Sequence, residues 1–157
     1  MARGAHALSL SEVKAQTAQL VVRFYDRIWH AGDLGAAQEL LAADFSFRGS
    51  LGPEMRGRDP FCQYVRSVRS ALAEYRCEIL DCVAAEQKAF AKMRFSGVHV
   101  GAFRGYAPTH RAVQWLGAAL FQFSGELIVE LWVLGDLLWL DEVLRRNAQS
   151  GPVPGQR

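Results

Sequence analysis

A single carboxylate interrupts an apolar run near the end of the chain. The run is "LWVLGDLLWLDEVL", residues 131–144, and the carboxylate belongs to Asp136. Burying an ionised carboxylate without a partner is costly, so Asp136 should be paired, protonated or placed at a helix end. It follows Gly135 and precedes leucines at helical spacing, which suits the cap of a final helix. In an apolar pocket, the same carboxylate would have a raised pKa and could serve as a general base.

A histidine is the second residue whose position suggests chemistry. Apolar and polar side chains alternate over residues 89–99, as in a strand with one buried and one wet face. His99 shares the apolar face with Met93 and Phe95. Such a histidine is either a pocket residue that exchanges protons or a core residue with satisfied hydrogen bonds. His99 and Asp136 could meet across a sheet, but only for a strand register that sequence alone does not fix.

Aromatic residues gather around these two candidates. Alternation over residues 127–135 places Trp132 on the same face as Asp136. The expected pocket residues are five aromatic side chains and one glutamine: Phe95, Phe103, Tyr106, Gln114, Trp115 and Trp132. The two tryptophans could equally be ordinary core residues. Tyr106 lies in the loop "GAFRGYAPTH", residues 101–110, which could cover a pocket mouth.

The elements that must position these residues follow an α+β order. A period near 3.6 begins at Ser11, which is available as a cap, and "HAGD" ends that helix near Gly32. Asp33 can cap the second helix. Helices are expected over residues 11–28, 33–41, 60–73 and 137–147, and strands over 75–84, 88–100, 111–123 and 127–135. "DFSFRG" predicts a short extended piece, "SLGPEMRGRDP" a loop, and "SGE" at 124–126 a hairpin turn.

Length and composition indicate an ordinary globular chain. Its 157 residues predict one domain, residues 1–157, with loose ends at about 1–10 and 148–157. Half the residues are hydrophobic and the net charge is +2, which argues against nucleic-acid binding. No uninterrupted apolar run of about 18 residues exists, so no membrane insertion is expected. The N-terminus also lacks a signal-peptide core, which argues against export.

Three cysteines complete this picture. Cys62, Cys77 and Cys82 have no metal-ligand spacing and cannot all pair with one another. A reduced, cytoplasmic protein without a metal site is the simplest interpretation.

Residues 95–140 contain a pattern that resembles a known family. The segment has the form S-G-x-H-x-G-x-F-x-G-x-x-P-T, followed by a hydrophobic hairpin and E-x-W-x-x-x-D before a terminal helix. The matching residues are Ser96, Gly97, His99, Gly101, Phe103, Gly105, Pro108, Thr109, Glu130, Trp132 and Asp136. This pattern resembles the SnoaL-like polyketide cyclase group of the NTF2-like superfamily. The resemblance extends over roughly residues 15–145.

The resemblance implies a fold and an activity. The fold would be an NTF2-like cone, in which a curved antiparallel sheet wraps against N-terminal helices around a deep apolar pocket. Similar proteins often form homodimers through the outer face of the sheet. The implied activity is a cofactor-free aldol-type ring closure of a hydrophobic, polyketide-like molecule. Asp136 would be the acid/base residue, and His99 would donate a proton or orient Asp136.

Two alternatives stay open beside ring closure. The same scaffold could open an epoxide, or it could bind a ligand or dimerise without catalysis, because fold alone does not determine function. The polar residues that the family carries on the penultimate strand are less clearly present, with Gln114 and Gln122 available there. The deciding feature is whether Asp136 and His99 point into one cavity. If Asp136 only caps a helix and His99 is packed away, the binding module is favoured.

Overall fold

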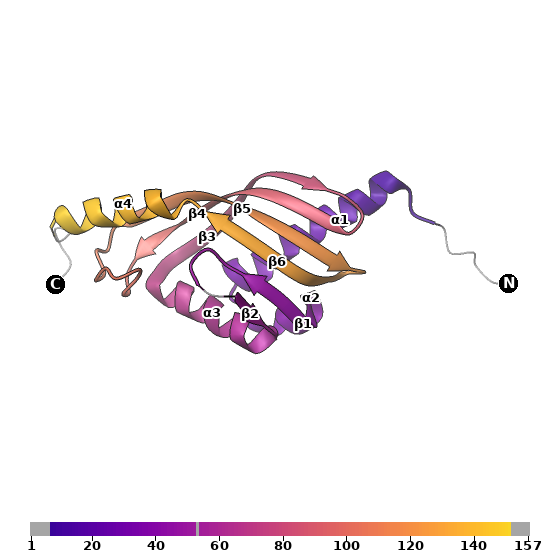
Figure 1. Ribbon diagram of the computed structural model, residues 1–157, viewed down its shortest axis with the longest axis horizontal. Coiled ribbons are helices and arrows are strands. Elements are labelled where there is room, and N and C mark those ends of the chain that lie inside the picture. Colours follow the sequence, from indigo (N-terminus) through magenta and orange to yellow (C-terminus); the bar gives the residue numbers. More distant parts are fainter. Residues whose placement is uncertain (1–6, 53, 152–157) are drawn as a thin grey trace.

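The computed structural model describes residues 7–52 and 54–151 and contains one curved six-stranded sheet (Figure 1). The strand order is β2-β1-β6-β5-β4-β3, and all neighbours are antiparallel except the parallel pair β1 and β6. The strands are β1 (Leu41–Arg48), β2 (Glu54–Arg56), β3 (Leu72–Ala84), β4 (Lys88–His99), β5 (Ala112–Ser124) and β6 (Leu127–Gly135). This is the α+β arrangement expected from the sequence.

Helices cover one face of this sheet and extend from one end of it (Figure 1). They are α1 (Leu10–Phe24), the π-helical turn η1 (Tyr25–His30), the 3-10 turn η2 (Leu34–Ala36), α2 (Ala37–Leu40), α3 (Arg58–Ala71) and α4 (Leu137–Gln149). Helix α1 packs on β3 and β4, and α3 packs on β1 and β3. Helix α4 contacts the end of β5. None of the helices in the described ranges is long and apolar enough to cross a membrane.

The first helix begins earlier than its sequence pattern suggested. Ser9, not Ser11, is the N-cap: its Oγ accepts the Glu12 N–H at 3.3 Å, and the Glu12 carboxylate accepts the Ser9 N–H at 2.6 Å. Two orphan N–H groups are satisfied reciprocally, which is why this serine is preferred. The helix ends before Gly32, whose φ of +69° suits glycine. Asp33 caps the next turn as expected, accepting the Ala36 N–H at 3.3 Å.

The expected strands are present with shifted ends. Strand β3 begins at Leu72 instead of residue 75, and the preceding helix α3 therefore ends at Ala71. Helix α3 also begins two residues earlier than expected, at Arg58. The loop "SLGPEMRGRDP" contains the short strand β2, which pairs with the end of β1. The final helix continues to Gln149, two residues beyond its expected end. The expected loose ends lie mostly outside the described residues.

A β-bulge in β6 reverses the faces expected for the last strand. Gln122 of β5 pairs with Glu130, whereas Phe123 pairs with Ile128, so Val129 is an extra residue on β6. One extra residue moves the following side chains to the opposite face. Ile128 is therefore buried, while Trp132 points outward and is 36% exposed. Trp132 and Asp136 therefore share a face, as expected, but it is the outer face of the sheet, and Ile128 lies on the inner one.

The core lies between the inner face of the sheet and the helices. Odd-numbered residues of β4 and β5 face inward and are buried: Ala89, Ala91, Met93, Phe95, Val113, Trp115, Ala119, Phe121 and Phe123. Aromatic side chains of the helical layer pack on them, for example Phe24 on Phe121 with centroids 5.5 Å apart. A second bulge, at Glu74 in β3, lies just before Tyr75 and Cys77, which both point into this core.

Candidate functional site

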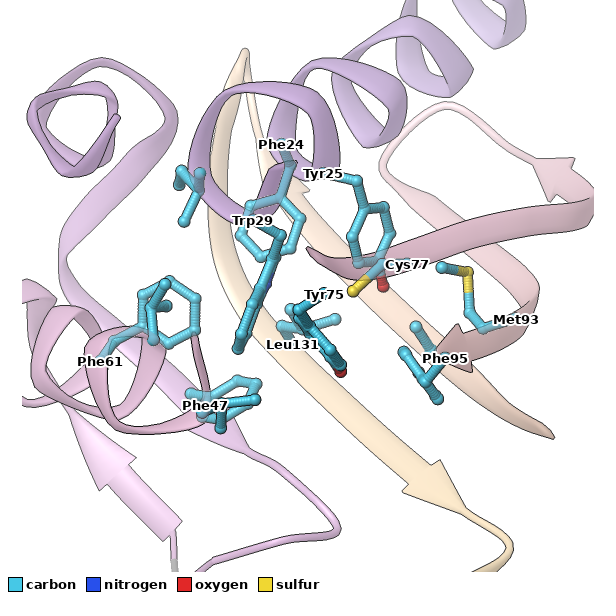
Figure 2. Close-up of a cluster of buried hydrophobic side chains, with 14 of the residues drawn as sticks. Phe24, Tyr25, Trp29, Phe47, Phe61, Tyr75, Cys77, Met93, Phe95 and Leu131 are labelled. Carbon is cyan, nitrogen blue, oxygen red and sulfur yellow. The ribbon is translucent and has the colours of Figure 1, made fainter. Parts of the chain in front are cut away.

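The candidate site is a narrow cavity between the helices and the sheet (Figure 2). Its volume is about 30 Å³, enough for one or two water molecules. Eight aromatic residues line it: Phe24, Tyr25, Trp29, Phe47, Tyr64, Tyr75, Phe95 and Trp115. The remaining lining residues are Gly49, Ser50, Leu51, Cys77, Leu131 and Val133. The wall of this cavity is therefore mostly aromatic, and the cavity is much smaller than the deep pocket that the family resemblance implies.

The polar groups in the cavity wall are neutral. The described lining residues include no carboxylate and no histidine. Burial raises the pKa values of the Tyr25 and Tyr75 hydroxyls well above the ordinary tyrosine value. Burial likewise raises the pKa of the Cys77 thiol, so this thiol is protonated and a weak nucleophile at neutral pH. The wall thus offers uncharged hydrogen-bond donors and no general base.

Two of these donors have no partner. The Tyr25 hydroxyl and the Trp115 indole N–H are shielded from solvent and form no hydrogen bond with any described residue. Figure 2 shows the Tyr25 side chain reaching from the helical layer toward Cys77 of β3. An unsatisfied buried donor costs about 1–3 kcal/mol, so two of them in one cavity wall call for an explanation. A bound molecule with an acceptor atom would satisfy such a donor.

Packing holds Trp115 in place. It points inward from β5, and its ring lies 5.5 Å from that of Phe95 and 6.2 Å from that of Tyr75, measured between centroids. Phe103 lies behind it at 6.4 Å. The indole is therefore fixed by rings on several sides, and its N–H has a defined direction.

Asp136 caps α4 and does not reach the cavity. Its Oδ1 accepts the Trp139 N–H at 3.0 Å, and its side chain is exposed. Its own N–H donates to the Leu116 carbonyl of β5, and Leu116 pairs with Arg94 of β4. The carboxylate follows the outward-facing residues of β6, because the bulge has reversed the strand. The capping role drawn from the sequence agrees with this geometry, and a pocket position does not.

His99 is packed into the end of β4. It is 0% exposed, and its Nδ1 lies 3.1 Å from the Thr109 hydroxyl. Burial is the main cause that lowers the pKa of its ring, so the imidazole is neutral at pH 7. The backbone of His99 also bonds that of His110 and Arg111. The residue therefore braces the loop at residues 101–110 and is not among the residues that line the cavity.

The two expected catalytic residues are thus not brought together. Asp136 bonds Leu116 of β5, and Leu116 pairs with Arg94 of β4. Arg94 is five residues before His99 on the same strand, a distance of about 16 Å. His99 faces the core, whereas Asp136 follows the outer face. A shared acid/base pair is incompatible with this register.

The expected pocket residues are divided in the same way. Phe95 and Trp115 line the cavity. Trp132 lies on the outer face with the Arg48 guanidinium 5.7 Å from its ring centre, and Gln114 is exposed on the same face. Phe103 and Tyr106 pair with each other in the loop and are half-buried, outside the cavity wall. Outward strand positions explain Trp132 and Gln114, and a tight local turn explains Phe103 and Tyr106.

The family of the chain follows from its sequence. The family model described as "SnoaL-like polyketide cyclase" matches residues 19–142. The chain belongs to the SnoaL-like polyketide cyclase family. A comparison with curated protein sequences finds no match.

Solved structures share the fold of this SnoaL-like protein. A crystal structure from Jannaschia sp. CCS1, described as that of a SnoaL-like polyketide cyclase, has a TM-score of 0.77 at 17% identity and covers 93% of this chain and 100% of its own. TsrD from Streptomyces laurentii has a TM-score of 0.74 at 24% identity, covering 88% and 98%. An LEH-like epoxide hydrolase of M. tuberculosis has a TM-score of 0.69 at 12% identity, covering 87% and 95%. These similarities show the NTF2-like fold.

Several cavity residues of this SnoaL-like chain escaped the sequence analysis. Tyr25 and Trp29 lie on the π-helical turn, where the 3.6-residue period that marked the first helix changes. Tyr75 and Cys77 share the inward face of β3, so the alternation of side chains along the strand was a signal that could have placed both in the cavity wall. Ser50 comes from the loop before β2, which had no detectable pattern. The described residues hold no group of three metal-ligating side chains.

Proposed function

We propose that this SnoaL-like protein binds a small, uncharged and largely apolar molecule in the aromatic cavity. One observation carries the proposal: buried donors of Tyr25 and Trp115, without partners among the described residues, lie in a wall that has no charged side chain. Burying a charged ligand group there would be costly, whereas an acceptor atom on an apolar ligand would satisfy a donor. Family membership makes a polyketide-like molecule the first ligand class to test.

Binding requires the cavity to widen. A volume of about 30 Å³ is far below the several hundred Å³ of a typical small-molecule site. Four members of the wall are half-buried: Ser50, Leu51, Tyr64 and Val133. Displacing Leu51 and Tyr64, the two largest of these side chains, would enlarge the space. The ligand would then stack on Trp29 and Tyr75, whose ring centroids are 5.4 Å apart.

Ring closure in the same cavity is the second candidate, favoured by the family match. A methylene between two carbonyls is already acidic, so its reaction needs mainly a folded chain and donors for the developing negative charge. The Tyr25 hydroxyl and Trp115 N–H could supply those donors. Asp136 and His99 would take no part. Epoxide opening is less favoured, because the described wall has no carboxylate to activate a water molecule.

We also propose that the protein forms a homodimer through the outer face of the sheet. Phe90, Leu120 and Trp132 form one continuous row across β4, β5 and β6, and Leu134 lies beside it. These side chains are between 36% and 49% exposed. A contiguous apolar patch of this kind usually marks a protein interface. The three cysteines are free thiols, in keeping with a reducing, cytoplasmic setting for this dimer.

The test is a titration of purified protein with 1-indanone and with a 1,3-diketone, followed by calorimetry and by product analysis. We expect saturable binding that weakens about 3–10-fold in Tyr25→Phe, since one hydrogen bond is lost. Asp136→Asn should bind as the wild type does. Absence of saturable binding would overturn the proposal. Turnover that disappears in a folded Asp136→Asn variant would restore the acid/base mechanism instead.

A further inference from the structure

Tyr75 lines a second, polar cleft besides the aromatic cavity. The volume of this cleft is about 430 Å³, which lies in the usual range for small-molecule sites, whereas the aromatic cavity must widen first. Residues of η1, α3 and β3 form its wall: His30, Arg69, Leu72, Glu74, Tyr75 and Arg76. The cleft can therefore accept a ligand in the conformation that the structure shows.

The Arg69 guanidinium is held in place at the wall of this cleft. Its Nη1 donates to the main-chain carbonyls of Trp29 and His30, the second at 3.0 Å. A methyl group at Gly32 would lie 2.9 Å from both Cζ and Nη2 of Arg69, so the flat face of the guanidinium rests against this glycine. The guanidinium therefore has a fixed orientation and loses little freedom when it binds a ligand.

Two donors of the same guanidinium remain available. Arg69 Nε and Nη2 form no hydrogen bond with any described residue. Neither atom is among the polar atoms shielded from solvent, and the side chain is half-buried. The Nε–H and Nη2–H bonds point away from one edge of the guanidinium plane, where they match the two oxygens of a carboxylate.

The charges around the cleft suit a single negative charge. Arg69 and Arg76 form no ion pair with a described carboxylate. Glu74 is the one carboxylate among the described wall residues, so two arginines against it leave an excess of one positive charge. His30 bonds the Asp26 carboxylate at 3.1 Å, and the arginines therefore supply the attraction. A monoanion is favoured, whereas the second charge of a dianion would meet Glu74 without a matching cation.

A β-bulge shapes the sheet side of the cleft. Two residues of β3, Glu74 and Tyr75, lie opposite the single residue Gly97 of β4. Glu74 has a φ of +53°, a left-handed conformation that is costly for a residue other than glycine. Bulges and strained residues of this kind gather at functional sites. The backbone thus points to the same place as the charges do.

We propose that this cleft binds the carboxylate of a small organic monoanion. Arg69 binds the two carboxylate oxygens through Nε and Nη2, and Arg76 adds a second positive charge. Leu72 and Tyr75 provide apolar surface for the carbon skeleton of the ligand. This site goes beyond the proposed function, because its donors lie outside the aromatic cavity and take a charged ligand that the cavity would reject.

The experiment compares benzoate with benzamide, a neutral molecule of nearly the same shape, by calorimetric titration of the full chain. We expect the wild type to prefer benzoate by about 10-fold, since charge-assisted hydrogen bonds are the stronger ones. Arg69→Gln should abolish the preference, and Arg69→Lys, which keeps the charge without the paired donors, should retain only part of it. Arg56→Gln changes an exposed arginine of β2, at the opposite edge of the sheet, and is the matched control that should keep the full preference.

Glu74→Gln tests the cleft without disturbing the bonds of Arg69 to η1. It removes the negative charge from the wall and should tighten benzoate binding by about 2–3-fold, with no change for benzamide. Arg76→Gln should weaken benzoate binding by a similar factor. Circular dichroism verifies that each variant is folded.

Four outcomes would overturn this assignment. The first is equal binding of benzoate and benzamide by the wild type. The second is a benzoate preference that survives in folded Arg69→Gln, and the third is a Glu74→Gln variant that binds benzoate no more tightly than the wild type. The fourth is benzoate binding that weakens in Tyr25→Phe but not in Arg69→Gln, which would place the ligand in the aromatic cavity. Failure of 1-indanone to bind would overturn the proposed function alone.

Discussion

At the scale of single residues, surroundings and not residue type determine what each polar group does. Asp136 and His99 have the chemistry of an acid/base pair, but one caps a helix on the surface and the other braces a loop from inside the core. The unpartnered donors of the cavity wall belong to Tyr25, which the sequence did not single out, and to Trp115, which was one of the expected pocket residues. The Tyr25 hydroxyl and the Trp115 N–H, which we propose contact the ligand, do not belong to any recognisable sequence motif.

Substitutions at Asp136 separate capping from catalysis. Asp136→Ala removes the acceptor of the Trp139 N–H and should lower the free energy of unfolding by about 1 kcal/mol. Asp136→Asn keeps an oxygen acceptor and should be close to the wild type. Urea denaturation of the three proteins measures the difference. Equal stability of the wild type and the alanine variant would show that the cap contributes nothing.

The buried His99 predicts a pH dependence of stability. Burial lowers the pKa of His99 from 6.5 in the folded protein, so on acidification the unfolded chain binds a proton before the folded one does. The free energy of unfolding should therefore fall as the pH decreases below about 6.5, down to the lowered folded pKa.

The His99→Gln variant should lose this component of the pH dependence. Its stability measured from about pH 7.5 to about pH 5 should form a flatter profile than that of the wild type. His110→Gln removes an exposed histidine whose charge also lowers the pKa of His99, although less than burial does, so it should reduce the slope less than His99→Gln does. Parallel profiles for the wild type and His99→Gln would contradict a neutral, buried His99.

At the scale of elements, the sequence predicted most helices and strands, although not β2, and it did not predict which faces the strands present. Alternation and capping residues located β4, β5, β6 and α4 to within a few residues. The bulge at Val129 has no distinctive residue, yet it moves Trp132 and Asp136 from the inner to the outer face. Face assignment depends on strand pairing, which is a tertiary property. This is why the fold could be predicted, whereas only Phe95 and Trp115 of the expected pocket residues line the cavity.

An ion pair joins the loop at residues 101–110 to α4. Arg104 donates two bonds to Asp141, at 2.6 and 2.9 Å. Both side chains are partly exposed, so a double-mutant cycle with Arg104→Ala and Asp141→Ala should give a coupling energy of at most about 1 kcal/mol, falling with salt. The single-contact pair of Arg146 and Glu142 within α4 should couple more weakly. A larger value for Arg146 and Glu142 would contradict the bidentate assignment.

At the scale of the whole molecule, the sheet separates the proposed binding site from the proposed dimer interface. Its inner face and the helices enclose the aromatic cavity, whereas its outer face carries the apolar row of Phe90, Leu120 and Trp132. Both faces draw on the same strands, β4, β5 and β6. The family resemblance implied such an arrangement, and the strand register shows which residues belong to each face.

The outer row predicts a dimer that a single charge disrupts. Leu120→Arg places a charge at the centre of the row and should convert the protein to a monomer, as measured by light scattering. Leu10→Arg introduces the same charge at an exposed residue of α1, away from the outer face of the sheet, and should leave the dimer intact. A monomeric wild type at micromolar concentration would contradict the proposed interface.

The most direct measurement of the central claim is a ligand titration monitored through the indole N–H signals of Trp29, Trp115, Trp132 and Trp139 in a ¹⁵N-labelled protein. Binding of 1-indanone in the cavity should shift the Trp115 signal most, with a smaller change at Trp29. The signals of Trp132 on the outer face and of Trp139, which bonds the Gln114 carbonyl, should stay in place. Shifts confined to Trp132 or Trp139 would place the ligand outside the cavity and contradict the proposed function.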